Sequence, residues 1–509
     1  MTLLLLLAPP ASTALGSTYG GDFASAPGTG VKRPEYVYLG LEALDNQGVS
    51  GNKVPQVAKW RTASAVTAPG AGSRLRQLAA VAGGNLHVQG ISSWDTFDDP
   101  TDPTLDAGAV YTWGFVHNQS LYLGDGLSYM VYDPRDGTLA KWESTGAGAM
   151  PEKCRLATVY RGRVVLARPA SQPQNWYMSA MDEPTIWDFF PKVITTDQAV
   201  FGNNAPAGLC PDIINTLIPH NDDMLIFGCD SSIWRLAGDP MEGGSFERLS
   251  DSTGMAFGPS WCKDPVGIIY FFGSKGGVYR MSPGGYPQFL SDARDGQDSS
   301  IQDRLTGIDL SSYRVELAWS FEEQGLYVYQ IPYAGSAEET PLAYFWDSKN
   351  NAWHEDQASD YRVSPFCVRS VDGDLPGDRR VVLGCQDGWL REIAADAVSD
   401  DTYPIRSEVT LGPLAAGGDI EIMLGRIKAV LAKEQAGCTF EVYASDEPSE
   451  LGRIVASGTL QPGQNPRLPV RRRGAFIWIV LRNTQAGERW ALEELMADIE
   501  PLGRRKVRA

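Results

Sequence analysis

The stretch 224–239, MLIFGCDSSIWRLAGD, has the pattern of a β-hairpin. An apolar run, 225–227, meets a tight polar turn, and a second run containing Ile233 and Trp234 ends on Arg235. Strand-forming residues occupy both arms, whereas glycine, aspartate and serine occupy the turn. We therefore expect two antiparallel strands here.

The same pattern recurs along the chain. An apolar arm ends at a glycine, a short polar turn follows, and the second arm carries a tyrosine or a tryptophan. The clearest further copies are 121–132, 268–281 and 380–393. One such hairpin cannot bury its apolar face alone, so the repetition implies that neighbouring hairpins cover one another. The turn positions that we expect to shape these hairpins are Gly124, Asp125, Gly228, Asp230, Gly273, Gly384 and Asp387.

The spacing of the repeats predicts the architecture. Apolar arms start near residues 86, 121, 164, 224, 268, 326 and 381, at intervals of 35 to 60 residues. A four-stranded propeller blade takes roughly 40–50 residues, and loop insertions account for the longer intervals. A β-sandwich would repeat less regularly, and a solenoid would have tighter periods. We predict an all-β chain built on a β-propeller of six or seven blades.

With 509 residues the chain is too long for one ordinary core, so two or three domains are expected. Residues 1–72 are rich in small residues and predict an extended arm with edge strands. The apolar run near the N-terminus is short and is broken by Pro9 and Pro10, so we interpret it as an arm that packs against this or a neighbouring subunit. Residues 73–401 form the propeller-like domain. Residues 402–509 alternate apolar and polar positions, which predicts a C-terminal β-sandwich or barrel.

Charge is distributed unevenly along the chain. The formal net charge of −18 argues against a general nucleic-acid binder. Residues 402–509 hold 15 basic and 13 acidic side chains, so the first 401 residues carry a net −20. Two basic clusters in the C-terminal part fit either solvated loops or an acidic partner such as a neighbouring subunit. These candidate subunit contacts are Arg471, Arg472, Arg473, Arg504, Arg505 and Lys506.

Motifs for catalysis are missing from the sequence. HExxH, GxSxG, P-loop and helix-opening GxGxxG patterns are all absent, and the four histidines are scattered. The seven cysteines form no CxxC pair, and we interpret Cys229 and Cys385 as small buried apolar residues. We therefore expect no catalytic, cofactor or metal site and no enzymatic activity.

Several segments resemble virion proteins of tailed phages. They are the strand–GxD–aromatic–Arg succession at 227–235 and 383–391, SAMDEPTIWDFF at 179–190, and the C-terminal GAFIWIVLRN and GERWALEELMADIEPLGRRK. The chain is most similar, over about 75–509, to tail tubular or nozzle proteins of short-tailed phages, which carry a β-propeller beside tube-forming β-domains.

This resemblance implies a structural protein of the phage tail. The chain would form a ring of about six copies, contact tail adaptor and tail fibre proteins, and pass double-stranded DNA without binding it specifically or inserting stably into a membrane. We expect an acidic lumen, because phosphate contacts would slow the DNA, and an arm at 1–30 that touches another subunit. Two alternatives stay open: an extracellular or surface propeller that binds glycans or proteins, and a propeller hydrolase with dispersed carboxylates.

Overall fold

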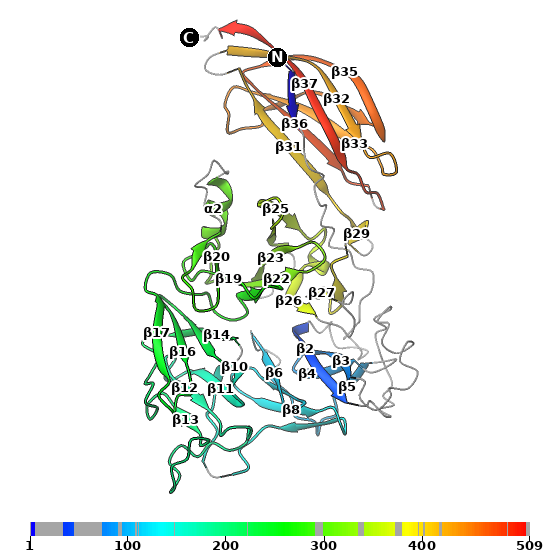
Figure 1. Cartoon of the computed structure of the whole chain (residues 1–509). Helices are drawn as coiled ribbons and strands as arrows, with labels where there is room; N and C mark the ends of the chain where they lie inside the picture. Colours follow the sequence, from blue (N-terminus) through cyan, green and yellow to red (C-terminus); the bar gives the residue numbers. More distant parts are fainter. Residues whose placement is uncertain are drawn as a thin grey trace. The chain divides into compact units, whose positions relative to one another are not determined.

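The computed structural model divides the chain into two compact units, Thr18–Ile393 and Met1–Ser17 with Ala394–Ala509 (Figure 1). Each unit is described by itself. The structure describes all residues except 1, 6–33, 45–73, 90–93, 107–108, 110, 147, 221, 291–298, 334–339, 372–378, 395–396, 401–402, 417–419, 486 and 505–509.

The larger unit is a seven-bladed β-propeller, counting the sheets within its described residues (Figure 1, blue to yellow). In each blade consecutive strands pair antiparallel in chain order. The first four blades consist of β2 (Pro34–Leu44), β3 (Arg74–Ala82), β4 (Asn85–Gln89) and β5 (Trp94–Phe97); β6 (Trp113–His117), β7 (Ser120–Gly124), β8 (Tyr129–Asp133) and β9 (Thr138–Lys141); β10 (Cys154–Tyr160), β11 (Arg163–Pro169), β12 (Trp176–Met178) and β13 (Val200–Phe201); and β14 (Ile214–His220), β15 (Met224–Cys229), β16 (Ile233–Ala237) and β17 (Ser245–Ser250).

The remaining three blades complete the ring. They consist of β18 (Trp261–Lys263), β19 (Ile269–Phe272), β20 (Val278–Met281) and β21 (Gln288–Phe289); β22 (Tyr313–Ser320), β23 (Gly325–Pro332), β24 (Leu342–Asp347) and β25 (Ala352–Gln357); and β26 (Pro365–Val371), β27 (Arg380–Cys385) and β28 (Leu390–Glu392). Helix α2 (Ser299–Thr306) lies between blades 5 and 6, and the short 3-10 helix Tyr361–Val363 precedes blade 7.

The continuous apolar run of the hairpin at 224–239 is explained by burial on both faces of β15. Successive side chains of a strand point to opposite faces of the sheet. Leu225 and Phe227 pack into the core shared by blades 3 and 4, whereas Ile226 packs into the core shared by blades 4 and 5. Because neighbouring blades cover both faces of β15, this strand carries apolar side chains at successive positions.

Among the described residues, the first and last blades are joined by packing and share no strand. All described strands of blade 1 come from the N-terminal side and all those of blade 7 from the C-terminal side, and β2 contacts β26 and β27. One apolar core joins the two blades, and Trp94 is its largest side chain. The other members are Leu78, Ala80, Ala82, Cys367, Val371, Val382 and Leu390.

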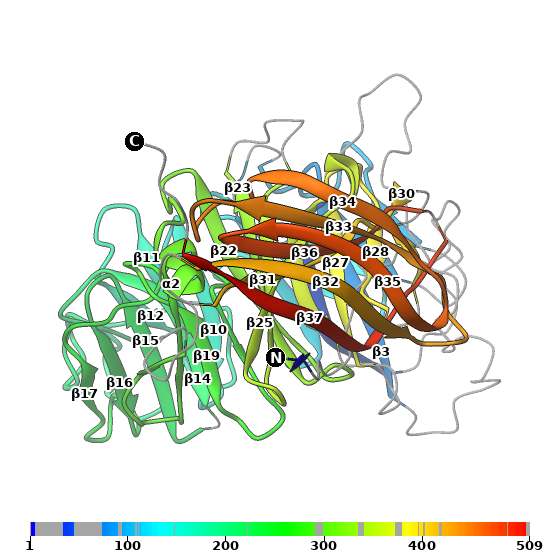
Figure 2. The same cartoon turned by 90° about the horizontal axis from the view of Figure 1, so that it is seen from above.

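The smaller unit is a β-sandwich (Figures 1 and 2, orange and red strands). Its sheets have the orders β1-β37-β32-β35 and β31-β36-β33-β34, and their facing side chains form one core. The strands are β1 (Thr2–Leu5), β31 (Ser407–Leu414), β32 (Ile420–Leu431), β33 (Cys438–Ser445), β34 (Arg453–Leu460), β35 (Gly463–Gly474), β36 (Phe476–Asn483) and β37 (Leu492–Arg504), with a separate pair of β29 (Ser399–Asp400) and β30 (Tyr403–Pro404).

The segment 1–72, expected as a separate arm with edge strands, is divided between the two units. β1 pairs antiparallel with β37 of the sandwich, with Leu3 opposite Ala497. β2 is the first strand of blade 1, where it pairs with β3. The rest of the segment lies outside the described residues. Within its own chain the arm thus contacts the sandwich through β1, and any contact of 1–30 with another subunit stays a prediction.

Candidate functional site

The predicted turn glycines lie within or beside strands, not at the point of chain reversal. Gly124 ends β7, and Gly228 and Gly384 lie inside β15 and β27. A Cβ atom at Gly124 would lie 2.2 Å from Cζ2 of Trp113, so the glycine lets the indole ring pack directly against the strand. A Cβ atom at Gly228 would similarly lie 2.3 Å from the Met255 sulfur. Gly124 thus allows close packing of neighbouring strands within blade 2, and Gly228 allows close packing against Met255 in the core shared by blades 4 and 5.

The chain reverses a few residues further on. Gly388 follows β27 with φ +90°, in the left-handed region that side chains with a Cβ rarely adopt. Gly273, which follows β19, precedes a turn whose Gly276 has φ +88°. From the sequence, the first glycine of each hairpin is expected at the chain reversal. In the structure this glycine allows close packing, and the chain reverses a few residues later.

Carboxylates hold the hairpin turns. Asp125 accepts hydrogen bonds from the backbone N–H groups two and three residues later, each at 2.7 Å. Asp387 forms two bonds of 2.7 Å with the guanidinium of Arg391. These contacts fix the geometry of each hairpin. The two carboxylates belong to different blades, Asp125 to blade 2 and Asp387 to blade 7.

In blade 4 the turn is held by a carboxylate that the sequence pattern does not single out. Asp230 stands at the predicted turn, but Asp212 accepts the hydrogen bonds of that turn. Its Oδ2 atom accepts from the Ser231 N–H at 2.9 Å and from the hydroxyls of Ser231 and Ser232 at 2.8 Å. Asp212, which accepts the hydrogen bonds of the turn, precedes the hairpin in sequence, and no local pattern identifies it.

The first basic cluster lies on an edge of the sandwich. Arg471–Arg473 belong to β35, which ends one sheet, and β34 ends the other sheet. The two edge strands and their connection, 453–474, hold five exposed arginines and no acidic residue. Arg472 donates from Nε to the Val455 carbonyl at 2.6 Å and so links β35 to β34. We call 453–474 the arginine edge.

The second basic cluster is described only in part. Arg504 ends β37, whereas Arg505 and Lys506 lie outside the described residues.

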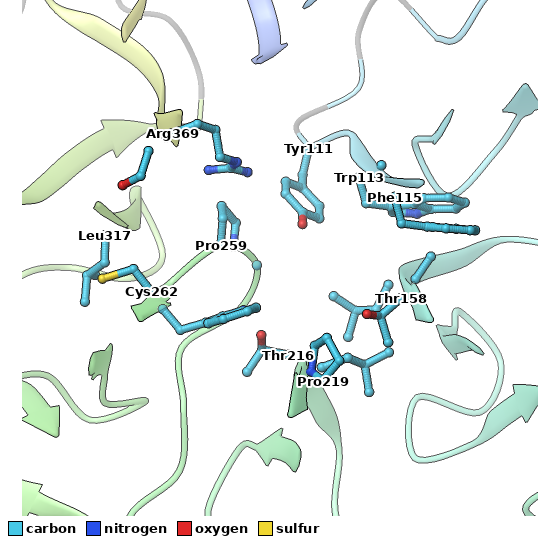
Figure 3. A pocket seen from close by; sticks show the side chains of 17 residues that line it. Tyr111, Trp113, Phe115, Thr158, Thr216, Pro219, Pro259, Cys262, Leu317 and Arg369 are labelled. Atoms are coloured by element: carbon cyan, nitrogen blue, oxygen red, sulfur yellow. The ribbon is translucent and has the colours of Figure 1, made fainter. Parts of the chain in front are cut away.

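A cavity of about 330 Å³ lies on the axis of the propeller, where the first strands of blades 2 to 7 face one another (Figure 3). We call it the axial cavity. Its wall combines aromatic rings, threonine hydroxyls and one guanidinium. The described residues that line it are Tyr111, Trp113, Gly114, Phe115, Leu156, Ala157, Thr158, Thr216, Leu217, Pro219, Gly258, Pro259, Trp261, Cys262, Leu317, Arg369 and Ser370.

The charge of the axial cavity comes from the interface of blades 6 and 7. Glu316, 1% exposed, accepts a bond from Nη1 of Arg369 at 3.1 Å and one from Nε of Arg314 at 3.1 Å. Its carboxylate also accepts the Val368 N–H at 2.8 Å. Two cations therefore share one carboxylate, and Arg369 is the member whose side chain reaches the cavity wall (Figure 3).

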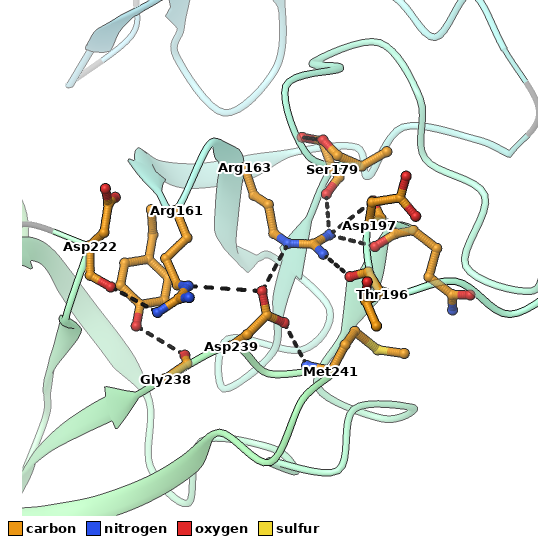
Figure 4. Close-up of polar contacts among 12 residues, drawn as sticks. Arg161, Arg163, Ser179, Thr196, Asp197, Asp222, Gly238, Asp239 and Met241 are labelled. Carbon is orange, nitrogen blue, oxygen red and sulfur yellow. Dashed lines mark hydrogen bonds and ion pairs between the residues drawn. The ribbon is translucent and has the colours of Figure 1, made fainter.

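An exposed apolar loop projects from blade 3. Phe190, Val193 and Ile194 are each at least 73% exposed, and they lie between β12 and β13. The fully buried guanidinium of Arg163 anchors the base of this loop (Figure 4). It donates to the carbonyl oxygens of Ser179, Thr196, Asp197 and Gln198, at 3.0, 2.5, 3.4 and 2.5 Å, and its Nε lies 3.9 Å from the Asp239 carboxylate of blade 4.

The side chains of His117 and of six of the seven cysteines are buried. Burial lowers the pKa of His117, and the nearby Asp182 acts in the opposite direction. Burial raises the pKa of Cys154 and of Cys367 to about 12, so both thiols stay protonated at neutral pH. Cys210 and Cys229 place their sulfur atoms 3.4 Å apart as free thiols.

The described residues contain no group of three or more His, Cys, Asp or Glu side chains that could hold a metal ion. In the same part of the chain, no helix is long and apolar enough to cross a membrane.

No protein-family model matches the chain, and no curated protein matches it in sequence. Solved structures similar to it include the extracellular domain of a putative one-component system from B. thetaiotaomicron, at 11% identity and a TM-score of 0.42, covering 69% of this chain and 40% of that one. BBS1N in complex with ARL6DN is 8% identical, with a TM-score of 0.37 and coverage of 78% and 98%. The N-terminal domain of Nup159 is 8% identical, with a TM-score of 0.32 and coverage of 62% and 85%.

These likenesses are too remote to bear on function. The chain spans less than half the length of the first of these structures. The class of protein, a β-propeller with a β-sandwich, is defined by the strand order and cores described above.

Proposed function

We propose that the chain is a structural virion protein of a tailed phage. Copies of it assemble into a ring of the tail nozzle or tube, which conducts double-stranded DNA during ejection. The proposal is supported by the segments that resemble phage tail proteins, such as SAMDEPTIWDFF at 179–190, and by the presence of a propeller and a β-sandwich in one chain.

The observation that carries the proposal is the arginine edge on a chain whose first 401 residues are acidic. A cyclic assembly joins two different patches of the same chain, head to tail, and the patches must be complementary. The arginine edge holds five exposed arginines without an acid, whereas the first 401 residues have a net charge of −20. Electrostatic attraction between the arginine edge of one copy and the acidic propeller of the next favours association and fixes its orientation.

Two further features fit such a ring. The exposed apolar loop of blade 3, held by Arg163, offers a second contact surface for a neighbouring copy or for a tail adaptor or fibre protein. The acidic excess of the propeller part disfavours contacts to DNA phosphates, each of which would add affinity and slow the passage of DNA.

The mass of the purified chain, measured by light scattering over a range of salt concentrations, tests the proposal. We expect a cyclic oligomer that weakens as salt screens the charges. Replacing Arg471, Arg472 and Arg473 by Glu should dissociate it, whereas Arg406→Glu with Lys433→Glu, exposed positions of the same unit outside the arginine edge, should leave most of it assembled. A monomer under every condition would overturn the proposal.

The alternative of a surface propeller that binds glycans or proteins is favoured by one observation, the axial cavity with its aromatic rings and Arg369. A ligand in that cavity is compatible with either assembly state, because the cavity lies within one propeller.

A further inference from the structure

The five most exposed large apolar side chains of the described residues lie at one end of the propeller. Consecutive strands of a blade pair antiparallel in chain order, so the connections after the first and third strands lie at one end, and the other connections lie at the opposite end. Phe190, Val193 and Ile194 follow the third strand of blade 3, whereas Val266 and Tyr286 follow the first and third strands of blade 5. These side chains are 73 to 86% exposed. Three separate connections thus expose apolar side chains at the same end.

Blade 4 joins these apolar groups into one surface. Arg161 of blade 3 donates from Nη1 to the carbonyl oxygen of Asp222 in blade 4 at 3.1 Å (Figure 4). On the other side of blade 4, Lys263 of blade 5 donates from Nζ to the Pro219 carbonyl at 2.5 Å. The turns of blade 4 therefore lie between the apolar side chains of blade 3 and those of blade 5.

The same connections are strongly acidic. They hold nine acidic and two basic side chains, whereas the connections at the opposite end, within and between these three blades, hold three acidic and one basic side chain. We call them the acidic face, which comprises 161–162, 179–199, 222–223, 238–244, 264–268 and 282–287. Its fully exposed charged residues are Asp182, Glu183, Lys192, Asp197, Asp222, Asp223 and Glu242.

The arginine edge complements the acidic face in charge and in apolar character. It holds five exposed arginines and no acidic residue. Next to Arg453 on β34, the side chain of Ile454 is 54% exposed. Protein interfaces combine apolar contact with a polar rim, and each of the two surfaces offers both parts. Because one chain carries both surfaces, a second copy of the chain supplies the partner, and such a head-to-tail contact generates rings.

We propose that the arginine edge of one copy docks on the acidic face of the next, with Asp222 and Asp223 near its arginines. The apolar side chains of blades 3 and 5 are then covered by the neighbouring sandwich. Burial of apolar surface favours association, and the opposite charges fix the orientation of the two copies. This inference rests on the proposed ring and names the surface of the propeller through which the ring is joined.

Charge reversal in the full chain, read by light scattering at low salt, tests the inference. Asp222→Lys with Asp223→Lys should weaken self-association at least about tenfold, because two attractive contacts become repulsive. Asp98→Lys with Asp251→Lys is the matched control, since it changes the net charge equally. Both control residues are exposed and follow the fourth strands of blades 1 and 4, at the opposite end of the propeller. This control should keep the assembly.

The apolar part of the contact has its own matched pair of variants. Ile194→Ser should weaken self-association, because the side chain is 77% exposed on the acidic face and is covered in the assembly. Leu127→Ser should leave self-association unchanged. Leu127 is 60% exposed and follows the second strand of blade 2, at the opposite end of the propeller.

Combined variants identify the two partner surfaces. One chain that carries Asp222→Lys and Asp223→Lys together with Arg471→Glu and Arg472→Glu has opposite charges exchanged between the surfaces, so it should recover the assembly. When the two double variants are made separately and mixed, each keeps one intact surface. The mixture should therefore form a pair of chains and no larger species.

Hydrogen exchange of the unaltered chain, compared between the assembled and the diluted state, needs no variant and is independent of any folding defect. Assembly should slow exchange in 179–199 and in 453–474. Absence of this protection, or undiminished assembly of folded Asp222→Lys with Asp223→Lys, would overturn the inference. If the arginine-edge variant still dissociated in that case, the ring would stand with another contact surface, whereas a parent chain that is monomeric under every condition would overturn both proposals.

Discussion

Replacement of Glu316 by Gln tests the polar connection between blades 6 and 7. Glu316 lies on β22, and its three hydrogen-bond donors are Arg314 on the same strand and Val368 and Arg369 on β26. The substitution keeps the size of the side chain and removes its negative charge. Two guanidinium groups of a buried interface then lose the negative charge of Glu316.

The magnitude follows from the hydrogen bonds that the Glu316 carboxylate accepts. The three bonds of 2.8 to 3.1 Å include two to charged donors, each worth roughly 1.5–3 kcal/mol. The amide oxygen of Gln retains part of this, but the loss of a negative charge between two guanidinium groups raises the cost. Breaking a buried ion pair on one side costs about 3–5 kcal/mol, and we expect Glu316→Gln to fall in that range.

Urea unfolding, followed by tryptophan fluorescence, measures the effect on the propeller transition. The chain has two units, so that transition is fitted separately from the transition of the sandwich. Glu322→Gln is the matched control, since this exposed carboxylate follows the same strand and its loss should change stability by less than about 0.5 kcal/mol. If Glu316→Gln proved as mild as this control, the connection between the blades would not rest on the carboxylate.

Three further changes probe other parts of the propeller. Trp94→Ala should lower the free energy of unfolding by about 3–5 kcal/mol, because the ring fills the core that closes blade 1 on blade 7; an unchanged urea midpoint would refute this. Gly124→Ala should cost about 1–3 kcal/mol, since its Cβ would overlap the Trp113 ring, and an unaltered near-ultraviolet dichroism spectrum would argue against the overlap. Burial lowers the pKa of His117 below 6.5, so the unfolded chain binds more protons there and stability should fall as pH drops from 6.5 towards the folded-state pKa. His117→Gln should flatten that fall, and identical pH profiles of variant and parent would exclude the effect.

Hairpins and their mutual burial could be predicted from the sequence because their signal is local. Ile226 lies between Leu225 and Phe227, and an uninterrupted apolar triplet before a polar turn already implies a strand buried on both faces. The spacing of such runs then gives a blade count close to the seven observed within the described residues. The alternating pattern after residue 402 likewise predicts a β-sandwich or barrel, and the two sheets around one core show that the domain is a sandwich.

Features that depend on distant residues could not be predicted in the same way. Asp212 holds the turn at Ser231 from 19 residues away, and Glu316 meets Arg369 across a blade boundary. The first pair depends on the pairing of β14 with β15 within blade 4, and the second on the packing of blade 7 against blade 6, so no local spacing reveals them. The small residues around 34–44 favour an arm, whereas the pairing of β2 with β3 makes this segment the first strand of blade 1. The described wall of the axial cavity comes from the first strands of blades 2 to 7 and the residues beside them, which the hairpin pattern leaves out.

Electron microscopy of the assembled chain tests the proposed function most directly, read for which side chains line the axis of the particle. The proposal predicts a closed ring whose lumen is lined mainly by Asp and Glu, with Arg471–Arg473 of the arginine edge against a neighbouring copy. A particle that stays monomeric, or a ring whose lumen is lined predominantly by Lys and Arg, would contradict it.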